Sequence, residues 1–257
     1  YQTKALQEAM DGQASKRLAA FVRRHFPALC KTLTAEQFSA AVTARESAAK
    51  RNGYLSERDI VTYTSLSLHL GAGFSSDPQL PWAGRTLSLS TIDKQARLAL
   101  TYKRAIAHLR QVHGAGDAHW LAAMSRFQRS LSTTRLSKRA GAVRTDEVAS
   151  WLRNLFPQKC VTLGNEGTRA LVAATTQLTS RYDLEISGAT VLLAGLQLML
   201  GHEFHQDSQH PWAFDMLRQG ADSAAARLDR LQLSTVRALD TWNQAHKAQP
   251  ARVAVAV

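Results

Sequence analysis

The chain contains an internal repeat with a constant offset of 130 residues. Residues 70–83 read LGAGFSSDPQLPWA and residues 200–213 read LGHEFHQDSQHPWA, so that eight positions are identical. The same offset, without a gap, aligns residues 23–37 with 153–167 and residues 96–98 with 226–228. A period this long is typical of a tandem domain duplication and too long for the common solenoid repeats. The sequence therefore predicts two homologous units, residues 14–115 and 144–245, joined by a connector of residues 116–143.

Within each unit the apolar residues recur at helical spacing. In unit one, apolar positions three and four residues apart follow Ser15, which we expect to be the N-cap of the first helix. Pro27 is expected to end or bend that helix. Further helices are expected over residues 35–52, from an N-cap at Ser56 to Leu70, and over residues 91–111. No segment alternates as a strand does, so the predicted fold is all-α: two bundles of about four helices each, joined by a basic, partly helical connector.

The repeated segment follows the end of the third helix of each unit. Its structural positions are Gly71, Phe74, Asp77, Pro81 and Trp82 in unit one, and Gly201, Phe204, Asp207, Pro211 and Trp212 in unit two. The glycine lets the chain leave the helix with a positive φ angle, and the two aromatic side chains are expected to cover the base of the bundle. We expect the aspartate to accept backbone N–H groups within its own loop and the proline to hold the chain extended. The segment is therefore predicted to attach one helix to the next.

The sequence offers no arrangement of residues that an enzyme requires. It lacks a Gly-x-Ser-x-Gly motif, a phosphate-binding loop and a repeated pair of carboxylates. A metal site built from His202, His205 and His210 is an alternative, but a zinc-protease helix needs His at i and i+4, where position 206 is Gln. We expect these histidines to lie on the surface. The sequence therefore predicts a non-enzymatic protein without a metal or a cofactor.

Cysteine content and hydropathy restrict the compartment in which the protein works. Cys30 and Cys160 occupy matching positions in the two units and are expected to be small buried thiols. Two cysteines do not form a disulfide scaffold, which favours a reducing compartment, and we predict a cytoplasmic location. No stretch reaches the roughly 18 apolar residues of a membrane-spanning helix, so no membrane partner is expected.

Net charge points to an acidic partner for the first half of the chain. The protein has 32 Lys and Arg against 20 Asp and Glu, a net charge of +12. Residues 1–115 contain 16 basic and 8 acidic side chains, residues 116–143 contain 5 and 1, and residues 144–257 contain 11 and 11. Such an excess steers an acidic protein or a nucleic acid, although no nucleic-acid module is recognisable. We expect partner binding to depend on Arg23, Arg24, Lys50, Arg51, Lys138 and Arg139.

Unit one resembles a bacterial accessory family associated with type VI secretion. The resemblance rests on Ser56-Glu57-Arg58-Asp59 at a helix start, followed by Gly71, Phe74, Asp77-Pro78 and Leu80-Pro81-Trp82-Ala83, and it covers about residues 14–95. Members of that family are encoded beside secreted effectors, spike proteins and adaptor chaperones. The resemblance implies an adaptor or co-chaperone that binds a secreted effector or its adaptor. An immunity protein that neutralises a toxin, or a nucleic-acid-binding protein, is the alternative.

Overall fold

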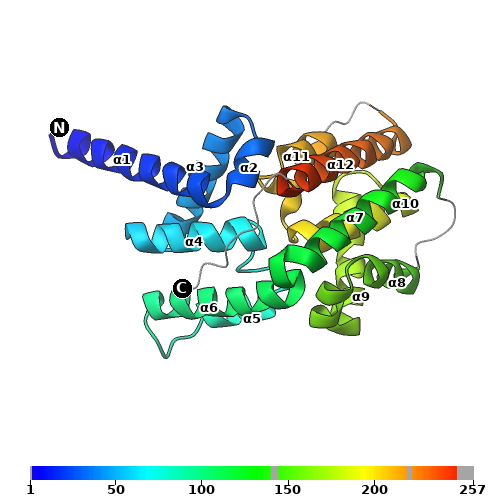
Figure 1. The fold of residues 1–257 in the computed structure, drawn as a ribbon, viewed down its shortest axis with the longest axis horizontal. Helices are drawn as coiled ribbons and strands as arrows, with labels where there is room; N and C mark the ends of the chain where they lie inside the picture. The colour runs from blue at the N-terminus through cyan, green and yellow to red at the C-terminus, as the bar shows by residue number, and fades with distance from the viewer. Residues whose placement is uncertain (1, 140–143, 219–221, 248–257) are drawn as a thin grey trace.

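The computed structural model describes residues 2–139, 144–218 and 222–247, with side chains described from residue 12 to residue 246. These residues form α-helices and three short 3-10 helices, with no strand among them, which confirms the all-α prediction. Figure 1 shows the first half of the chain on one side of the molecule and the second half on the other. The first half contains α1 (Gln2–His25), α2 (Pro27–Thr32), α3 (Ala35–Arg51), α4 (Glu57–Leu70), α5 (Pro81–Leu87) and α6 (Lys94–His113).

The second half repeats this order with one additional helix at its start. It contains α7 (Ala118–Thr133), α8 (Thr145–Leu155), α9 (Pro157–Arg181), α10 (Ser187–Leu200), α11 (Pro211–Arg218) and α12 (Ala224–Lys247). The 3-10 helices are η1 (Ala115–Asp117), η2 (Leu136–Lys138) and η3 (Phe204–Gln206). At the offset of 130 residues, α9 covers both α2 and α3, and its backbone leaves the helical conformation at Gly164, with φ 76° and ψ 170°. The corresponding residue of unit one, Thr34, is the N-cap of α3.

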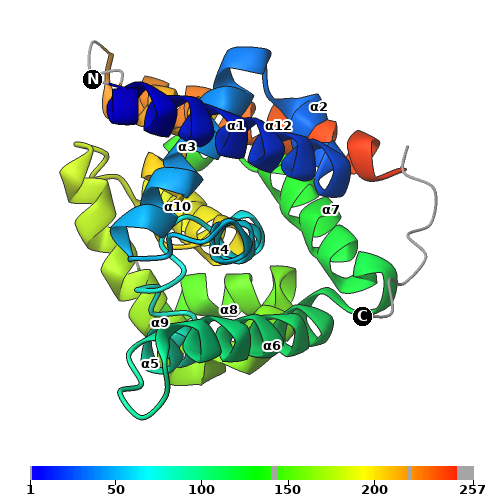
Figure 2. The ribbon, with the colours of Figure 1, turned by 90° about the vertical axis from the view of Figure 1, so that its left-hand side faces the viewer.

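Two separate groups of buried side chains form the core. One contains residues of α1, α3, α4, α5 and α6, and the other contains residues of α7 to α12 together with η2. The helix α10 lies at the centre of the second group, and all its residues from Gly188 to Leu200 are buried. In Figure 2, α4 and α10 occupy the middle of the molecule, with the other helices around them. None of the described helices combines the length and the apolar composition that crossing a membrane requires.

The ends of the helices show which local signals in the sequence are decisive. Ser56 is the N-cap of α4 and accepts a hydrogen bond from the backbone N–H of Asp59 at 3.1 Å, as predicted. Ser15 is not an N-cap, because α1 begins before it, at Gln2. The prediction of an extended chain at Pro81 is wrong, because this proline begins the short helix α5, and Pro211 begins α11 in the same way. Proline suits the first turn of a helix, where its missing N–H group has no partner to lose.

The connector of residues 116–143 does not stand apart from the two bundles. Its first part is α7, whose Met124, Phe127 and Leu131 are buried in the core of the second half. The short helix η2 packs against α10 and α12. Residues 140–143 lie outside the described residues. Unit one is therefore α1 to α6, and unit two is α7 to α12.

The position of α7 gives a stability prediction. The side chain of Phe127 is fully buried and its ring lies 5.8 Å from Trp151 and 5.5 Å from Phe156, measured between ring centroids. We expect Phe127→Ala to lower the free energy of unfolding by about 3 to 5 kcal/mol, because it leaves a cavity in the core. Chemical denaturation followed by circular dichroism measures the change. Tyr102→Ala, on the exposed side of α6, is the control, and a similar loss for both variants would contradict the assignment of α7 to this core.

Candidate functional site at the contact between the repeated loops

The two repeated segments meet each other at the boundary between the units. We call residues 71–80, between α4 and α5, loop one, and residues 201–210, between α10 and α11, loop two. Gly71 and Gly201 end α4 and α10 with φ angles of 98° and 97°, so that the predicted positive φ is present in both. A Cβ atom on Gly71 would lie 2.7 Å from the carbonyl oxygen of Leu200, and one on Gly201 would lie 3.1 Å from that of Leu70. The C-terminal ends of the two central helices are therefore in contact, and glycine permits this approach.

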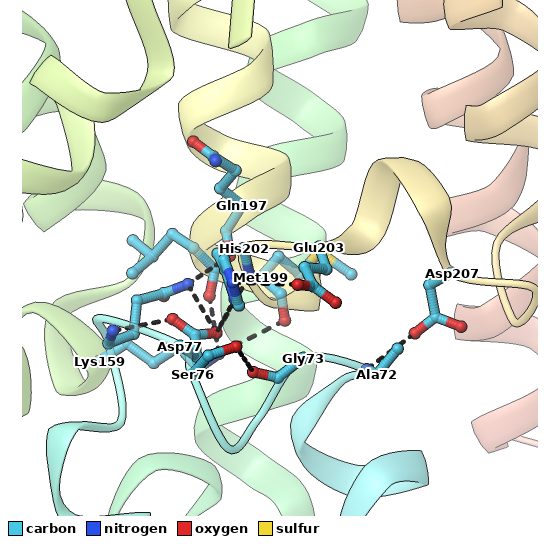
Figure 3. A network of polar contacts seen from close by, with 12 residues as sticks. Ala72, Gly73, Ser76, Asp77, Lys159, Gln197, Met199, His202, Glu203 and Asp207 are labelled. Atoms are coloured by element: carbon cyan, nitrogen blue, oxygen red, sulfur yellow. Dashed lines mark hydrogen bonds and ion pairs between the residues drawn. The ribbon is translucent and has the colours of Figure 1, made fainter. Parts of the chain in front are cut away.

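The two aspartates of the repeat bind each other's loop. The backbone N–H of His202 donates to Asp77 Oδ2 at 3.1 Å, and the backbone N–H of Ala72 donates to Asp207 Oδ2, also at 3.1 Å. Positions 72 and 202 are equivalent in the repeat, so the two hydrogen bonds are related by a local twofold axis (Figure 3). The other oxygen of each carboxylate accepts the backbone N–H two residues further on, at 2.8 Å. The predicted contact within the loop is thus present, and a second contact joins the two units.

The repeated glutamines extend this exchange between the units. Gln79 Nε2 donates to the carbonyl oxygen of Gln197 at 2.8 Å, and Gln209 Nε2 donates to that of Leu68 at 3.4 Å. Both acceptors belong to the last turn of a central helix, where backbone carbonyls begin to lose their partners within the helix, and the carbonyl of Gln197 also accepts the backbone N–H of Gly201 at 3.0 Å. The Asp and the Gln of the motif therefore satisfy backbone groups of the opposite unit, which explains why the sequence contains both twice.

Asp207 is fully buried and is paired with a buried arginine from unit one. Arg45 on α3 donates through Nη2 to Asp207 Oδ1, and it also contacts Ser208 Oγ at 3.0 Å and Gln209 Oε1 at 3.1 Å. Arg45 and Asp207 are both almost completely inaccessible to solvent. Burial raises the pKa of Asp207, but the charge of Arg45 and the hydrogen bonds to the carboxylate outweigh it, and the pKa is lowered overall. The carboxylate is therefore ionised at neutral pH.

Asp77 is compensated by different residues, which come from unit two. Lys159 Nζ donates to the carbonyl oxygens of Leu198 at 2.7 Å and Met199 at 3.4 Å, at the C-terminal end of α10 (Figure 3). Burial lowers the pKa of Lys159 to about 8, and the negative charge of Asp77 acts in the opposite direction. His202 Nδ1 lies 3.5 Å from Asp77 Oδ2. Burial lowers the pKa of His202, but the contact with Asp77 and its negative charge raise it more, so that its pKa is above the usual range.

Contacts outside the loops follow the same local symmetry. The helix α6 packs on α9, and α12 packs on α2. At the offset of 130 residues, α12 corresponds to α6, and the beginning of α9 corresponds to α2. The interface is therefore isologous, like that of a symmetric homodimer.

Within each unit the repeated arginine holds the end of the short helix. Arg97 Nη1 donates to the carbonyl oxygen of Leu87 at 3.3 Å, and Arg227 Nη2 donates to that of Leu217 at 2.9 Å.

The aromatic residues of the motif lie on the inner side of each loop. Phe74 and Phe204 are fully buried, as a cover for the base of the bundle requires. The tryptophans are only partly buried and lie against the last helix of their units: Trp82 contacts His108 on α6, and Trp212 contacts Trp242 on α12. The tryptophans therefore join the short helices α5 and α11 to the long helices α6 and α12, whereas the phenylalanines belong to the buried core of each unit.

The three histidines of loop two are not surface residues, which corrects the prediction. His205 and His210 are buried, and His202 is only one quarter exposed. His205 Nδ1 lies 3.0 Å from the hydroxyl oxygen of Tyr182, and the ring of His210 packs at 5.6 Å against Trp242. Burial lowers the pKa of each of these two rings to about 4. Within the described part of the chain, no three His, Cys, Asp or Glu residues are arranged to hold a metal ion.

The thiols differ between the units. Cys160 is buried and Cys30 is only partly buried, and burial raises the pKa of both. Both are free thiols.

The six basic residues expected to bind a partner lie in three places. Arg23 and Arg24 are at the end of α1, where the Arg23 guanidinium lies 4.6 Å from the ring centroid of Phe38. Lys50 and Arg51 are at the end of α3, and Lys50 pairs with Glu46 at 2.9 Å. Lys138 and Arg139 are at η2, on unit two, where Arg139 pairs with Glu147 at 3.3 Å. The pair from the connector thus belongs to the surface of unit two.

Comparison of the chain with protein-family models, with curated proteins and with solved structures gives no match in any of the three. The resemblance of unit one to the secretion-associated family therefore stays a hypothesis, which rests on the motif residues alone.

Sequence reasoning did not find Arg45 or Lys159. Neither is repeated, because Thr175 stands at the position equivalent to Arg45 and Leu29 at the position equivalent to Lys159. Arg45 carries one usable signal, since it lies among Phe38, Ala41, Val42 and Ala49 on the buried face of α3. A charged residue on such a face predicts a buried partner.

The pair of Arg45 and Asp207 gives a prediction for the interface. We expect Arg45→Met to lower the free energy of unfolding by about 3 to 5 kcal/mol, because it leaves a buried carboxylate without its cation. The double variant Arg45→Met and Asp207→Asn is expected to recover much of this loss, because the charge is removed as well. A double-mutant cycle by urea denaturation measures the coupling between the two residues. If the loss in the double variant equals the sum of the losses in the two single variants, the pair does not stabilise the interface.

The buried histidines predict loss of stability in mild acid. In the folded protein the pKa of His210 is about 4, below the value of about 6.5 for an unfolded chain. Between these values the unfolded chain binds the proton and the folded protein does not, so the free energy of unfolding falls as pH decreases from about 6.5 to 4. His210→Gln is expected to reduce this slope, by at most about 1.4 kcal/mol per pH unit.

His202 supplies the control of opposite sign. Its pKa is raised in the folded protein, so its contribution to stability is present below about pH 6.5 and is lost as the pH rises through the folded value. His202→Gln is therefore expected to remove a gain in stability that occurs as the pH falls from the folded pKa to about 6.5, and to leave the slope below pH 6.5 unchanged. Thermal melts between pH 4 and 8 measure both effects, and slopes that are the same for both variants would contradict these pKa directions.

Proposed function

We propose that the chain is a non-enzymatic binding protein, an adaptor or co-chaperone that holds an acidic protein partner such as a type VI secretion effector or its adaptor. Support comes first from where the repeated motif lies. Both loops are used in the contact between the units, with Asp77 and Asp207 buried. A partner therefore binds on the outer surfaces of the helices.

The observation that carries the proposal is the exposed, unpaired basic surface of unit one. Eleven of its basic side chains are exposed and form no ion pair with any side chain that the structure describes: Lys16, Arg23, Arg24, Lys31, Arg51, Arg58, Arg85, Lys94, Lys103, Arg104 and Arg110. In unit two and η2 the balance is different, because five arginines pair with carboxylates: Arg135, Arg139, Arg144, Arg169 and Arg230. Unpaired positive charge attracts an acidic surface and accelerates association.

Charge reversal tests the proposal. We expect Arg24→Glu with Arg51→Glu to slow association with the effector or adaptor encoded beside the chain about tenfold at low salt, because both side chains are exposed and unpaired. The matched control is Arg181→Glu with Arg237→Glu, which reverses two exposed arginines of unit two. Biolayer interferometry at several salt concentrations measures the rates.

Three results would contradict the proposal. The first is the recovery of neither an effector nor an adaptor when the tagged chain is expressed in its own cells. The second is an equal effect of the control pair. The third is binding of duplex DNA or RNA at physiological salt that the unit one variants abolish, which would favour a nucleic-acid partner. Rescue of growth from a co-expressed toxin, without restored secretion, would identify the chain as an immunity protein instead.

A further inference from the structure

A partly open cavity of about 240 Å³ lies between the units, beside the contact of the two loops. Its wall comes from both units: α2 and the end of α4, α6, α7, the beginning of α9, the end of α10 and α12, together with parts of loop one and loop two. The cavity therefore lies between the two symmetric outer contacts, α2 with α12 and α6 with α9. Neither the contact between the loops nor the basic surface of unit one uses this space.

Most of the wall is apolar. Side chains from both units form it, including Leu29, Leu109, Val112, Met124, Leu163 and Trp242. An apolar cavity of about 150 Å³ holds a molecule the size of benzene. A cavity of this volume therefore accommodates a compact molecule of about ten non-hydrogen atoms.

One end of the wall carries a cluster of nitrogen groups around Lys159. Its ammonium group lies 5.7 Å from the ring centroid of Trp120, which in turn stacks on His113 at 5.0 Å. His108 completes the cluster. Burial and then the positive charge of Lys159 lower the pKa of His108 to about 4, so the imidazole is neutral at physiological pH. The ring of His210 is also part of the wall, is buried and has no hydrogen bond from its Nδ1.

This combination fits a small anion with an apolar body. We propose that the cavity binds a monocarboxylate of about ten non-hydrogen atoms, with its carboxylate at Lys159 and His108 and its hydrocarbon part along the apolar wall. An ammonium group and a neutral imidazole N–H both donate to a carboxylate, and a partly buried pair of opposite charges is stronger than an exposed one. Because both units form the wall, a bound carboxylate also holds the two units together.

Octanoate, with about ten non-hydrogen atoms, is the probe, and 1-octanol is its uncharged counterpart. Isothermal titration calorimetry on the full chain is expected to show octanoate binding at least tenfold more tightly than 1-octanol. Lys159→Met is expected to weaken octanoate at least tenfold and to leave 1-octanol unchanged, and Lys159→Arg to retain octanoate. The control is Lys103→Met, on the exposed side of α6. Leu109→Trp fills the cavity and is expected to abolish the binding of both molecules.

The pH dependence tests the assignment without any substitution. The titratable groups that act on Lys159 are Asp77 in loop one and Cys160 on α9, and Lys159 in turn acts on His108 on α6. His113 on α6 and Asp117 in η1 also line this wall. His69, His210 and His246 line the remainder of the wall. The pKa of Lys159 is about 8, so octanoate affinity is expected to fall about tenfold between pH 7 and 9. Binding at pH 9 is expected to take up a proton, seen as a dependence of the heat on the buffer.

Four results would overturn the proposal. They are the absence of octanoate binding at millimolar concentration, equal affinity for 1-octanol, an affinity unchanged by Lys159→Met in a folded protein, and an affinity that is constant between pH 7 and 9. The first would show that the cavity holds no such ligand, and the others would show an apolar cavity in which Lys159 only stabilises the end of α10.

Discussion

The structure depends on a contact that is electrostatically unfavourable by itself: the C-terminal ends of α4 and α10 meet at Gly71 and Gly201. Each helix end carries about half a negative charge, and two carboxylates are buried beside them. Three cationic or protonatable groups lie at the same place, namely Arg45, Lys159 and His202. The core of each unit ends at this contact. The two units therefore keep their relative position only if these positive groups offset the negative helix ends and carboxylates.

The compensation is exchanged between the units. Arg45 belongs to unit one and pairs with Asp207 of unit two, and Lys159 and His202 belong to unit two and act on Asp77 of unit one. The two aspartates are repeated in the sequence, whereas Arg45, Lys159 and His202 are not. The position of each carboxylate is fixed by the loops, because the carboxylate also accepts two backbone N–H groups. A cation has a long side chain and reaches the same carboxylate from several positions, so its place in the sequence is free to differ between the units.

The helical spacing of the apolar residues predicted the fold class, and the repeat identified the residues that matter in the loops, but neither showed what those residues contact. Asp77 matches a local turn motif, and its hydrogen bond to the backbone N–H of Gln79 is such a contact. Its bond to His202 joins positions 125 residues apart, which no local pattern specifies. The same limit applies to Ser15, whose hydroxyl bonds Glu46 on α3 while α1 continues through it. The prediction for Pro81 is wrong because proline is compatible with both an extended chain and a helix start.

The attachment of α7 to α6 by the short η1 turn has a consequence for assembly. Two similar units that meet through an isologous interface are also able to pair between different chains. In one chain, however, the short connection keeps the second unit beside the first at an effective concentration on the order of millimolar. Pairing within the chain therefore does not depend on the protein concentration, and it is favoured over exchange between molecules until the protein itself approaches that concentration. Lengthening the turn lowers this advantage only slowly, because the entropy of closing a loop grows with the logarithm of its length.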